Sequence, residues 1–288
     1  MGKYLKLFKN HAQYETFIVG GGETPFVKPN VSYCIEENEV HYNPWSWADE
    51  YLTFVALEDG KFRSTFGGVE YSLDNGKTWW GLREEYYTPT VTAGNKIMWK
   101  GHFGTSLYNM FDSTGKFDVQ GNVMSLLYGD DFKGQTDLSD KTEVFAALFS
   151  DNNIINAKNL SLPATTLSKG CYKEMFHHCE WLETAPVLPA TTLAKDCYYE
   201  MFARCDMLET APVLPATTLV NGCYDFMFNE CYSLKYIKAM FTTSPVGDYT
   251  TAWVYGVAET GTFVKNSAAT WDVTGDSGIP SGWTVVTE

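Results

Sequence analysis

The residues best suited to bind a metal are two adjacent histidines and a nearby glutamate. His177, His178 and Glu180 are ligand types that zinc accepts. On a helix, however, adjacent side chains point about 100° apart, and 26 residues later the repeating sequence replaces both histidines with Ala203 and Arg204. We therefore expect no metal site, and the sequence predicts no cofactor.

Catalytic sets are equally difficult to assemble. Acidic doublets such as Asp49-Glu50, Glu84-Glu85 and Asp130-Asp131 lie in predicted loops, and a chain with 35 acidic residues contains such pairs by chance. The chain has 5 histidines, and six of its 7 cysteines recur at apolar positions of a repeat. No Ser-His-Asp or Cys-His arrangement can be assembled from these residues, so the protein is not expected to be an enzyme.

One local motif keeps a carbohydrate-active enzyme open as a minor alternative. The segment from Ser72 to Trp79 matches an Asp-box, a hairpin turn in which the aspartate accepts backbone hydrogen bonds and a glycine has positive φ. The box resembles those repeated around sialidase propellers. It is structural there and occurs once here, so it supports an enzyme only weakly.

The histidines belong to a segment that states one pattern three times. Leu-Pro-Ala-Thr-Thr-Leu begins at Leu162, Leu188 and Leu214, a period of 26 residues. A fixed period in the twenties with recurring leucine is typical of a solenoid. Each repeat, or rung, cannot bury its apolar side alone, so we expect the rungs to stack.

Each rung is predicted to contain a short helix and a short strand. Between Leu167 and Cys179 apolar residues lie at i, i+4, i+5, i+8, i+9 and i+12, which gathers them on one side of a helix. Pro186 and Pro189 prevent the next segment from continuing that helix. That segment is therefore predicted to be extended.

Comparison of the three copies separates constant positions, which we expect to face inward, from variable positions, which we expect to form an outward binding face. Aromatic, methionine and arginine side chains are common where proteins recognise one another. Some of these side chains could instead pack on neighbouring rungs or on the upstream domain, and the helical wheel places His178 at the edge of the apolar arc. The candidate residues are Lys173, Glu174, His177, His178, Glu180, Trp181, Tyr199, Glu200, Arg204, Met207, Asp225, Phe226 and Asn229.

Upstream of the repeats, short strand-like runs with turn residues every eight to twelve positions predict a β-sandwich. Strand alternation turns Trp47 and Trp80 outward, and Tyr86 and Tyr87 lie in a charged, loop-like insert. Rigid aromatic rings beside polar groups are typical of binding loops. These four residues are therefore added to the candidate binding residues.

The predicted fold class is α+β, with an N-terminal β-sandwich-like domain followed by a short leucine-rich-repeat solenoid of strand-helix rungs with terminal caps. A helix is expected over residues 138–149, in the first cap. The predicted domains are an N-terminal β segment at 1–44, a β-sandwich-like domain with one Asp-box hairpin at 45–127, a solenoid cap at 128–161, repeats at 162–241 and a C-terminal β cap at 242–288.

Charge and hydropathy limit the partners. The net charge is −14, and lysine and arginine are scattered singly, which argues against nucleic acid or an anionic membrane as partner. No apolar run is long enough to cross a membrane, and no signal peptide is visible in this chain. Paired repeat cysteines are eight residues apart, or about 12 Å along a helix, too far to bridge within a rung. We expect them to be buried, with pairing between adjacent rungs left open.

The pattern Leu-Pro-Ala-Thr-Thr-Leu-x-x-x-Cys-Tyr-x-x-Met-Phe-x-x-Cys-x-x-Leu resembles BspA-like leucine-rich repeat proteins of gut Bacteroidales bacteria and their phages. The resemblance extends over residues 138–288 and includes the ending from Gly278 to Trp283. It implies adhesion or receptor binding of the phage-tail type, sometimes with hypervariable positions, on a virion or bacterial cell surface. The outer residues here are more often charged or bulky than the small ones usual in that family.

These observations predict a non-enzymatic binding or adhesion protein that recognises a host cell-surface protein or glycan. The main alternative is a structural virion or tail component in which the repeats only present or connect other parts. In that case residues 1–44 would mediate assembly, and a homo-oligomer through this segment is possible in either hypothesis.

Overall fold

The computed structural model describes residues 3–9, 12–19, 33–36, 39–42, 44–104 and 106–288. It divides into two compact units, Met1–Ser46 and Trp47–Glu288. The first contains two antiparallel pairs, β1 (Lys3–Lys9) with β2 (Ala12–Val19) and β3 (Tyr33–Glu36) with β4 (Glu39–Tyr42). The rest of the predicted N-terminal β segment lies outside the described residues, and its role in assembly stays a prediction.

A 3-10 helix, Pro44–Asp49, spans the boundary between the units, and the second unit contains an open sheet of strand order β12-β11-β5-β9-β7-β8. The pairs are antiparallel except for β11 with β12, which are parallel. Strand bounds are β5 Leu52–Ala56, β7 Val69–Ser72, β8 Trp80–Leu82, β9 Lys96–Lys100, β11 Phe117–Asn122 and β12 Ile154–Ser161. β6 (Phe62–Ser64) and β10 (Phe111–Ser113) form a separate antiparallel ribbon.

The protein is mostly β, and the predicted α+β class is wrong. In the described residues the only α-helix is α1 (Ser125–Tyr128), which a short 3-10 turn, Gly129–Asp131, follows. The sandwich prediction is wrong as well, because the upstream strands join one open mixed sheet and a ribbon. Phe54 and Trp99 lie at the centre of their aromatic core with ring centroids 5.4 Å apart.

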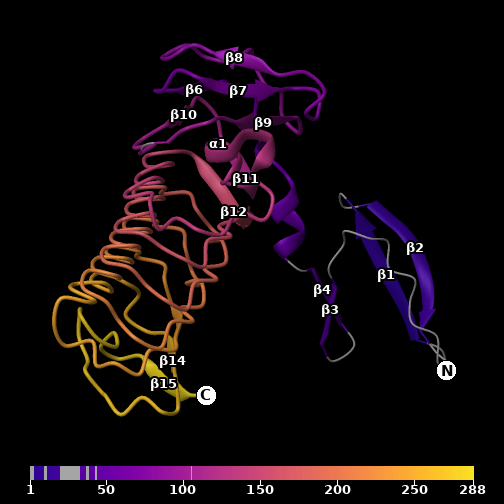
Figure 1. Cartoon of the computed structure of the whole chain (residues 1–288). Coiled ribbons are helices and arrows are strands. Elements are labelled where there is room, and N and C mark those ends of the chain that lie inside the picture. The colour runs from indigo at the N-terminus through magenta and orange to yellow at the C-terminus, as the bar shows by residue number, and fades with distance from the viewer. Residues whose placement is uncertain (1–2, 10–11, 20–32, 37–38, 43, 105) are drawn as a thin grey trace. The chain divides into compact units, whose positions relative to one another are not determined.

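The strand-helix rung is also wrong, because the rungs stack without helices (Figure 1). Between residues 170 and 179, odd-numbered N–H groups donate within the rung to the residue three earlier, as Lys173 N does to Gly170 O at 3.1 Å. Even-numbered N–H groups donate to the next rung, as Glu174 N does to Tyr199 O at 2.7 Å. An α-helix would use every donor within its own segment, so this half of each rung is a series of turns.

The predicted helix over 138–149 fails for the same reason. Phe145 N donates to Cys171 O of the next rung at 3.0 Å, and Leu148 N donates to Phe145 O at 3.3 Å. The segment thus supplies a further turn-containing rung. Its rings continue the core of the repeats, with Phe145 stacked on Tyr172 at 5.8 Å and 7° between planes.

A turn unit of four residues explains the apolar spacing. Each unit of the repeats buries two neighbouring residues and turns the next two outward, where only the small Ala203 is itself buried. The second outward residue has a left-handed backbone, as at Glu174 (φ 56°) and His178 (φ 59°). The buried rings form columns through the rungs. Tyr198 lies 6.0 Å from Tyr224, and their planes are 8° apart. Such ring pairs contribute about 0.5–1.5 kcal/mol beyond area burial.

The six repeat cysteines, two in each rung, are buried free thiols, as expected. The second cysteine of each rung donates from Sγ to a phenylalanine carbonyl of the preceding rung. The three bonds are Cys179 to Phe149 O at 3.0 Å, Cys205 to Phe176 O at 3.2 Å and Cys231 to Phe202 O at 3.0 Å. These thiols therefore join consecutive rungs.

The other side of each rung is extended and is called the strand side. Isolated parallel bridges join Asn156 to Thr184 and Thr210 to Tyr236. A three-stranded parallel sheet of β13 (Tyr236–Ala239), β14 (Thr262–Lys265) and β15 (Thr284–Thr287) follows at the C-terminal end. Pro186 and Pro189, like Pro212 and Pro215 one rung later, lie on this side. Because proline has no N–H to donate, these residues limit the number of hydrogen bonds between neighbouring rungs.

Candidate binding surface

The predicted repeat residues gather on the outer side of the turns, and we call this surface the turn face. Because every turn unit points two residues outward, the same columns recur from rung to rung. The constant cysteine, tyrosine, methionine and phenylalanine residues are buried, whereas all predicted residues of the turn face are half-buried or exposed. The turn face consists of Lys173, Glu174, His177, His178, Glu180, Trp181, Tyr199, Glu200, Arg204, Met207, Asp225, Phe226 and Asn229.

A first network crosses three rungs. Lys173 Nζ lies 3.1 Å from Glu174 Oε1 and 5.2 Å from the ring centre of Tyr199 on the next rung. Tyr199 in turn meets Phe226 edge-on, with centroids 5.8 Å apart. The upstream domain joins this network through Tyr108, whose hydroxyl donates to Glu174 Oε2 at 3.3 Å. The contacts hold these side chains in one orientation.

A second column contains charged residues of both signs. His178 Nδ1 lies 2.6 Å from Asp151 Oδ1, and its Nε2 lies 3.0 Å from Glu180 Oε1. His178 therefore lies between two carboxylates. Further along the column, Arg204 Nε lies 3.0 Å from Glu230 Oε2.

Two more predicted residues are held by the chain that follows the repeats, and one pair is looser. Asp225 Oδ1 accepts a hydrogen bond from Thr251 N at 2.6 Å. Asn229 Nδ2 donates to Ala252 O at 3.3 Å. By contrast, His177 Nε2 and Glu200 Oε2 are 3.8 Å apart, so this pair is longer than a hydrogen bond.

The contacts of the turn face also shift its ionisation. Although burial opposes it, hydrogen bonds from His178 and Ser150 lower the pKa of Asp151. The charge of Glu174 and partial burial raise the pKa of Tyr108. Burial and a hydrogen bond to Glu200 raise that of Tyr199. Both tyrosines therefore stay neutral at physiological pH and donate to the carboxylates.

The backbone of the turn face adopts a conformation that normally favours glycine. Six outward residues, two in each rung, have φ between 51° and 62°. The same requirement is met by glycine at Gly170, Gly222 and Gly256. A residue with a side chain in this region costs about 1 kcal/mol relative to the right-handed region. The six are Glu174, His178, Glu200, Arg204, Phe226 and Glu230.

One margin of the turn face carries exposed apolar side chains. Trp181 and Met207, 26 residues apart, are 42% and 44% exposed. Lys116 of the upstream domain places its Nζ 3.7 Å from the ring centre of Trp181, which covers one face of the indole. The upstream domain thus touches the turn face at two residues, Glu174 and Trp181.

The aromatic residues predicted in the upstream domain come from separate elements: Trp47 from the 3-10 helix, Trp80 from β8, and Tyr86 and Tyr87 from the segment after β8. Trp80 on β8 is 61% exposed, Tyr86 is 63% exposed, and Trp47 is half-buried. In the described part of the chain, no hydrogen bond, ion pair or ring contact joins Trp80, Tyr86 or Tyr87 to the turn face. The structure does not bring the two predicted groups together.

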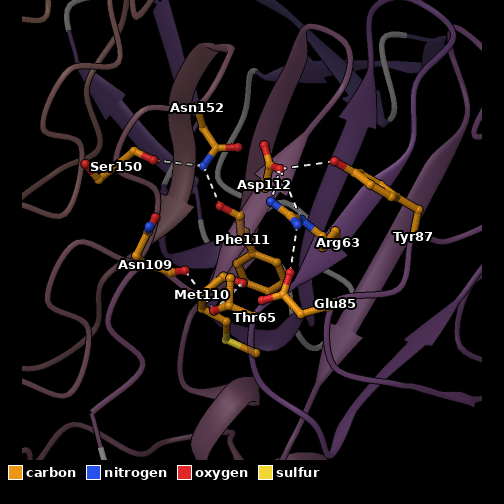
Figure 2. Close-up of polar contacts among 10 residues, drawn as sticks. All are labelled: Arg63, Thr65, Glu85, Tyr87, Asn109, Met110, Phe111, Asp112, Ser150 and Asn152. Carbon is orange, nitrogen blue, oxygen red and sulfur yellow. Dashed lines mark hydrogen bonds and ion pairs between the residues drawn. The ribbon is translucent and has the colours of Figure 1, made fainter.

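Tyr87 is fixed by a polar cluster (Figure 2). Its hydroxyl donates to Asp112 Oδ2 at 3.2 Å, and the guanidinium carbon of Arg63 lies 5.4 Å from its ring centre. Arg63 also binds Asp112 through Nη2 and Glu85 through Nη1, both at 2.7 Å. This cluster fastens the segment after β8 onto the β6–β10 ribbon, which supports a structural role for Tyr87.

Sequence reasoning missed four residues of the surface. Tyr108 and Lys116 belong to the upstream domain, and no sequence pattern places them beside the repeats. Asp151 lies 27 residues before His178 and has the same left-handed backbone. Extension of the repeat register into the first cap would have found it. Glu230 follows Asn229 and pairs with Arg204 in the second column.

The described ranges contain neither a metal-binding cluster nor a membrane-spanning helix. Those residues contain no group of three or more histidine, cysteine, aspartate or glutamate side chains placed to hold a metal ion. Within the same ranges no helix has the length and apolar character needed to cross a membrane.

Comparison with known proteins gives no assignment. No protein-family model matches the chain, and no curated protein or solved structure is significantly similar to it.

Proposed function

We propose that this protein is a non-enzymatic binding protein that attaches to a cell-surface protein or glycan through the turn face. Its place of action would be the surface of a virion or of a bacterial cell, as the resemblance to BspA-like repeat proteins implies. The main support is the choice of residues at the left-handed positions of the turn face. The rigidity and the composition of that surface add to it.

The observation is that bulky or charged residues occupy backbone positions where glycine would be more stable. Phe226, Arg204 and Glu200 each have a left-handed backbone and project outward. Their cost, about 1 kcal/mol each, is not offset by burial in the core. Residues that break a local rule without gain in stability are expected at functional sites.

The first supporting property is rigidity. The Lys173–Tyr199 and Tyr199–Phe226 contacts cross from rung to rung. Each rung is in turn tied to the next by backbone hydrogen bonds such as Glu174 N to Tyr199 O. A partner therefore meets side chains that are already ordered, which lowers the entropy cost of association.

The second supporting property is composition. Tyr199, Phe226, Trp181 and Met207 are the residue types that contribute most to protein interfaces. The mixture of these residues with charged residues of both signs, such as Arg204 and Glu230, favours specific recognition over general adhesion.

A cell-binding assay tests the proposal. Fluorescently labelled protein is incubated with cells of a panel of gut Bacteroidales strains, and binding is measured by flow cytometry. The triple variant Trp181→Ala, Tyr199→Ala, Phe226→Ala should lose binding while its melting temperature stays within about 2 °C of the parent. The control variant Val246→Ala changes a residue that is 68% exposed outside the turn face and should bind normally. Unchanged binding by the triple variant would refute the proposal.

A further inference from the structure

A second, separate surface lies on the strand side, where a groove of about 590 Å³ opens between two rungs. Ligand sites in proteins commonly measure about 300–1,000 Å³. None of the residues around it belongs to the proposed turn face except Met207 at its margin. The groove is lined by Lys158, Glu183, Thr184, Ala185, Met207, Glu209, Thr210, Ala211 and Pro212.

The groove lies where the parallel ladder of the strand side is interrupted. Thr184 is bridged to Asn156 on its N-terminal side, and Thr210 is bridged to Tyr236 on its C-terminal side. Within the described residues no backbone hydrogen bond joins Thr184 or Ala185 to Thr210.

A proline lies beside this gap on each of its two rungs. Both rungs that border it contain a proline at the matching place, Pro186 and Pro212, and proline has no N–H to donate. The neighbouring strands β12 and β13 contain none, and each makes hydrogen bonds with the rung beside it. Only the junction between two proline-containing rungs stays open.

The interruption leaves both donors and acceptors at the groove. The N–H groups of Ala185 and Thr210, and the carbonyl of Glu183, have no hydrogen-bond partner among the described residues, and neither has the Thr210 hydroxyl. Two of the equivalent groups one rung away are satisfied, since Ala211 N donates to Tyr236 O at 2.9 Å and the Thr184 hydroxyl to Asn156 Oδ1 at 2.5 Å. Because Glu183 and Thr210 are exposed and Ala185 is half-buried, water reaches these groups, and a ligand whose polar groups replace that water can take its place.

The charges at the groove nearly cancel. Glu183 and Glu209 are acidic, but Lys158 lines the groove and Lys235 Nζ lies 2.7 Å from Glu209 Oε2. The apolar part consists of small surfaces, the side chains of Ala185, Ala211 and Pro212 with Met207. A site for a charged peptide would carry a net charge, and a site for a large apolar side chain would offer a larger apolar surface.

We infer that this groove is a saccharide-binding site, independent of the proposed turn-face function. A sugar hydroxyl both donates and accepts hydrogen bonds, so one ring can satisfy the Thr210 hydroxyl and N–H as well as the Glu183 carbonyl. The carbon-bound hydrogens of the ring then face Ala185, Met207 and Pro212. The ligand class is a neutral or amino sugar unit of an oligosaccharide.

The first test is direct binding by the full chain. An array of oligosaccharides built from glucose, galactose, mannose and N-acetylglucosamine units is screened, and the tightest oligosaccharide is titrated by calorimetry. We expect a dissociation constant of about 1 mM or tighter. Retention of none of these oligosaccharides would overturn the inference.

Matched variants then locate the site. Thr210→Val removes the unpaired hydroxyl at constant shape and should weaken the titrated oligosaccharide by about tenfold. Thr218→Val, which changes an exposed threonine of the next rung outside the groove, should leave affinity unchanged. Tyr199→Ala should also leave it unchanged, which separates failure of this inference from failure of the turn-face proposal. Equal affinity in Thr210→Val, or loss in Tyr199→Ala, would overturn the groove assignment.

An NMR measurement on the unmodified protein tests the same site without any substitution. In amide NMR spectra, the saccharide should shift the Ala185 and Thr210 resonances, whose N–H groups are unpaired. It should move Ala211 much less, since that N–H is bonded to Tyr236 O. Shifts confined to turn-face residues such as Lys173 would contradict the inference.

Discussion

Arg204 Nε lies 3.0 Å from Glu230 Oε2 on the next rung, and both residues have left-handed backbones with φ of 62° and 58°. An exposed ion pair of this kind contributes about 0–1 kcal/mol. Two side chains in the left-handed region cost about 1 kcal/mol each. The pair therefore does not offset its own backbone cost, and stability alone does not explain why these residues stand where glycine would fit.

The backbone cost is measured by two substitutions at one position. Glu230→Ala and Glu230→Gly lose the same contact with Arg204, but only glycine relieves the left-handed strain. The glycine variant should be more stable than the alanine variant by about 1 kcal/mol in urea unfolding. An alanine variant of equal or greater stability would show that the turn places no strain on this residue.

The phenylalanine column should carry much of the stability of the rungs. Phe202 is fully buried, with centroids 5.5 Å from Phe176 and 5.8 Å from Phe228. Phe202→Ala should lower the free energy of unfolding by about 3–5 kcal/mol. Phe226→Ala, on the turn face of the next rung, is the control and should cost under about 1 kcal/mol. Similar losses for both would contradict the column as the main core.

The Asp-box turn gives a stability that depends on pH. Thr78 donates from its N and Oγ1 to Asp74 at 2.9 and 2.7 Å, and Ser72 Oγ donates at 2.8 Å. These bonds lower the pKa of Asp74 to about 2, below the unfolded value of about 3.9. The unfolded state therefore binds more protons between these values, and the contribution is present above about pH 4 and lost as pH falls through about 2.

Urea unfolding of the parent and of Asp74→Asn across pH 2–7 checks this. The stability difference between them should be constant near neutral pH and should shrink as the pH falls below about 4. Ser113→Ala, which changes a residue outside the turn, is the control for general acid effects. A difference between parent and Asp74→Asn that does not change with pH would exclude the turn as its source.

The repeat cysteines should resist alkylation in the native protein. Burial raises the pKa of Cys179 and of Cys231 to about 12, so on the order of 10⁻⁴ of each thiol is ionised at pH 8. Mass spectrometry after iodoacetamide treatment should find the peptides that contain these residues unmodified until urea is added. Alkylation at the same rate with and without urea would contradict their burial.

The period of the repeats and the inward or outward direction of their residues followed from the sequence. Comparison of the copies placed Cys171 and Phe176 inside and Tyr199 and Phe226 outside, as the structure does. It succeeded because each copy occupies an equivalent environment, so that only outward positions are free to differ. For the upstream domain it indicated strands near β5, β7 and β9, but not how they pair.

The helix prediction failed because two structures share nearly the same apolar spacing. Pairs such as Cys171-Tyr172 and Met175-Phe176 recur every four residues, which is close to one helical turn but equals the length of the observed turn unit. Glycine at Gly170 and Gly222, spaced by two rungs, was the available sign of a left-handed position. It was not decisive, because glycine also ends helices.

The sequence by itself determined the 26-residue period, the buried cysteines and the choice of outward residues, since these depend on residue types within one rung. Only the tertiary structure decided whether Glu174 N bonds within its segment or to Tyr199 O, because that donor finds its acceptor on another rung. The same holds for the partners Tyr108 and Asp151 and for the groove at Thr210. Each arises from contacts between rungs or domains that no local pattern encodes.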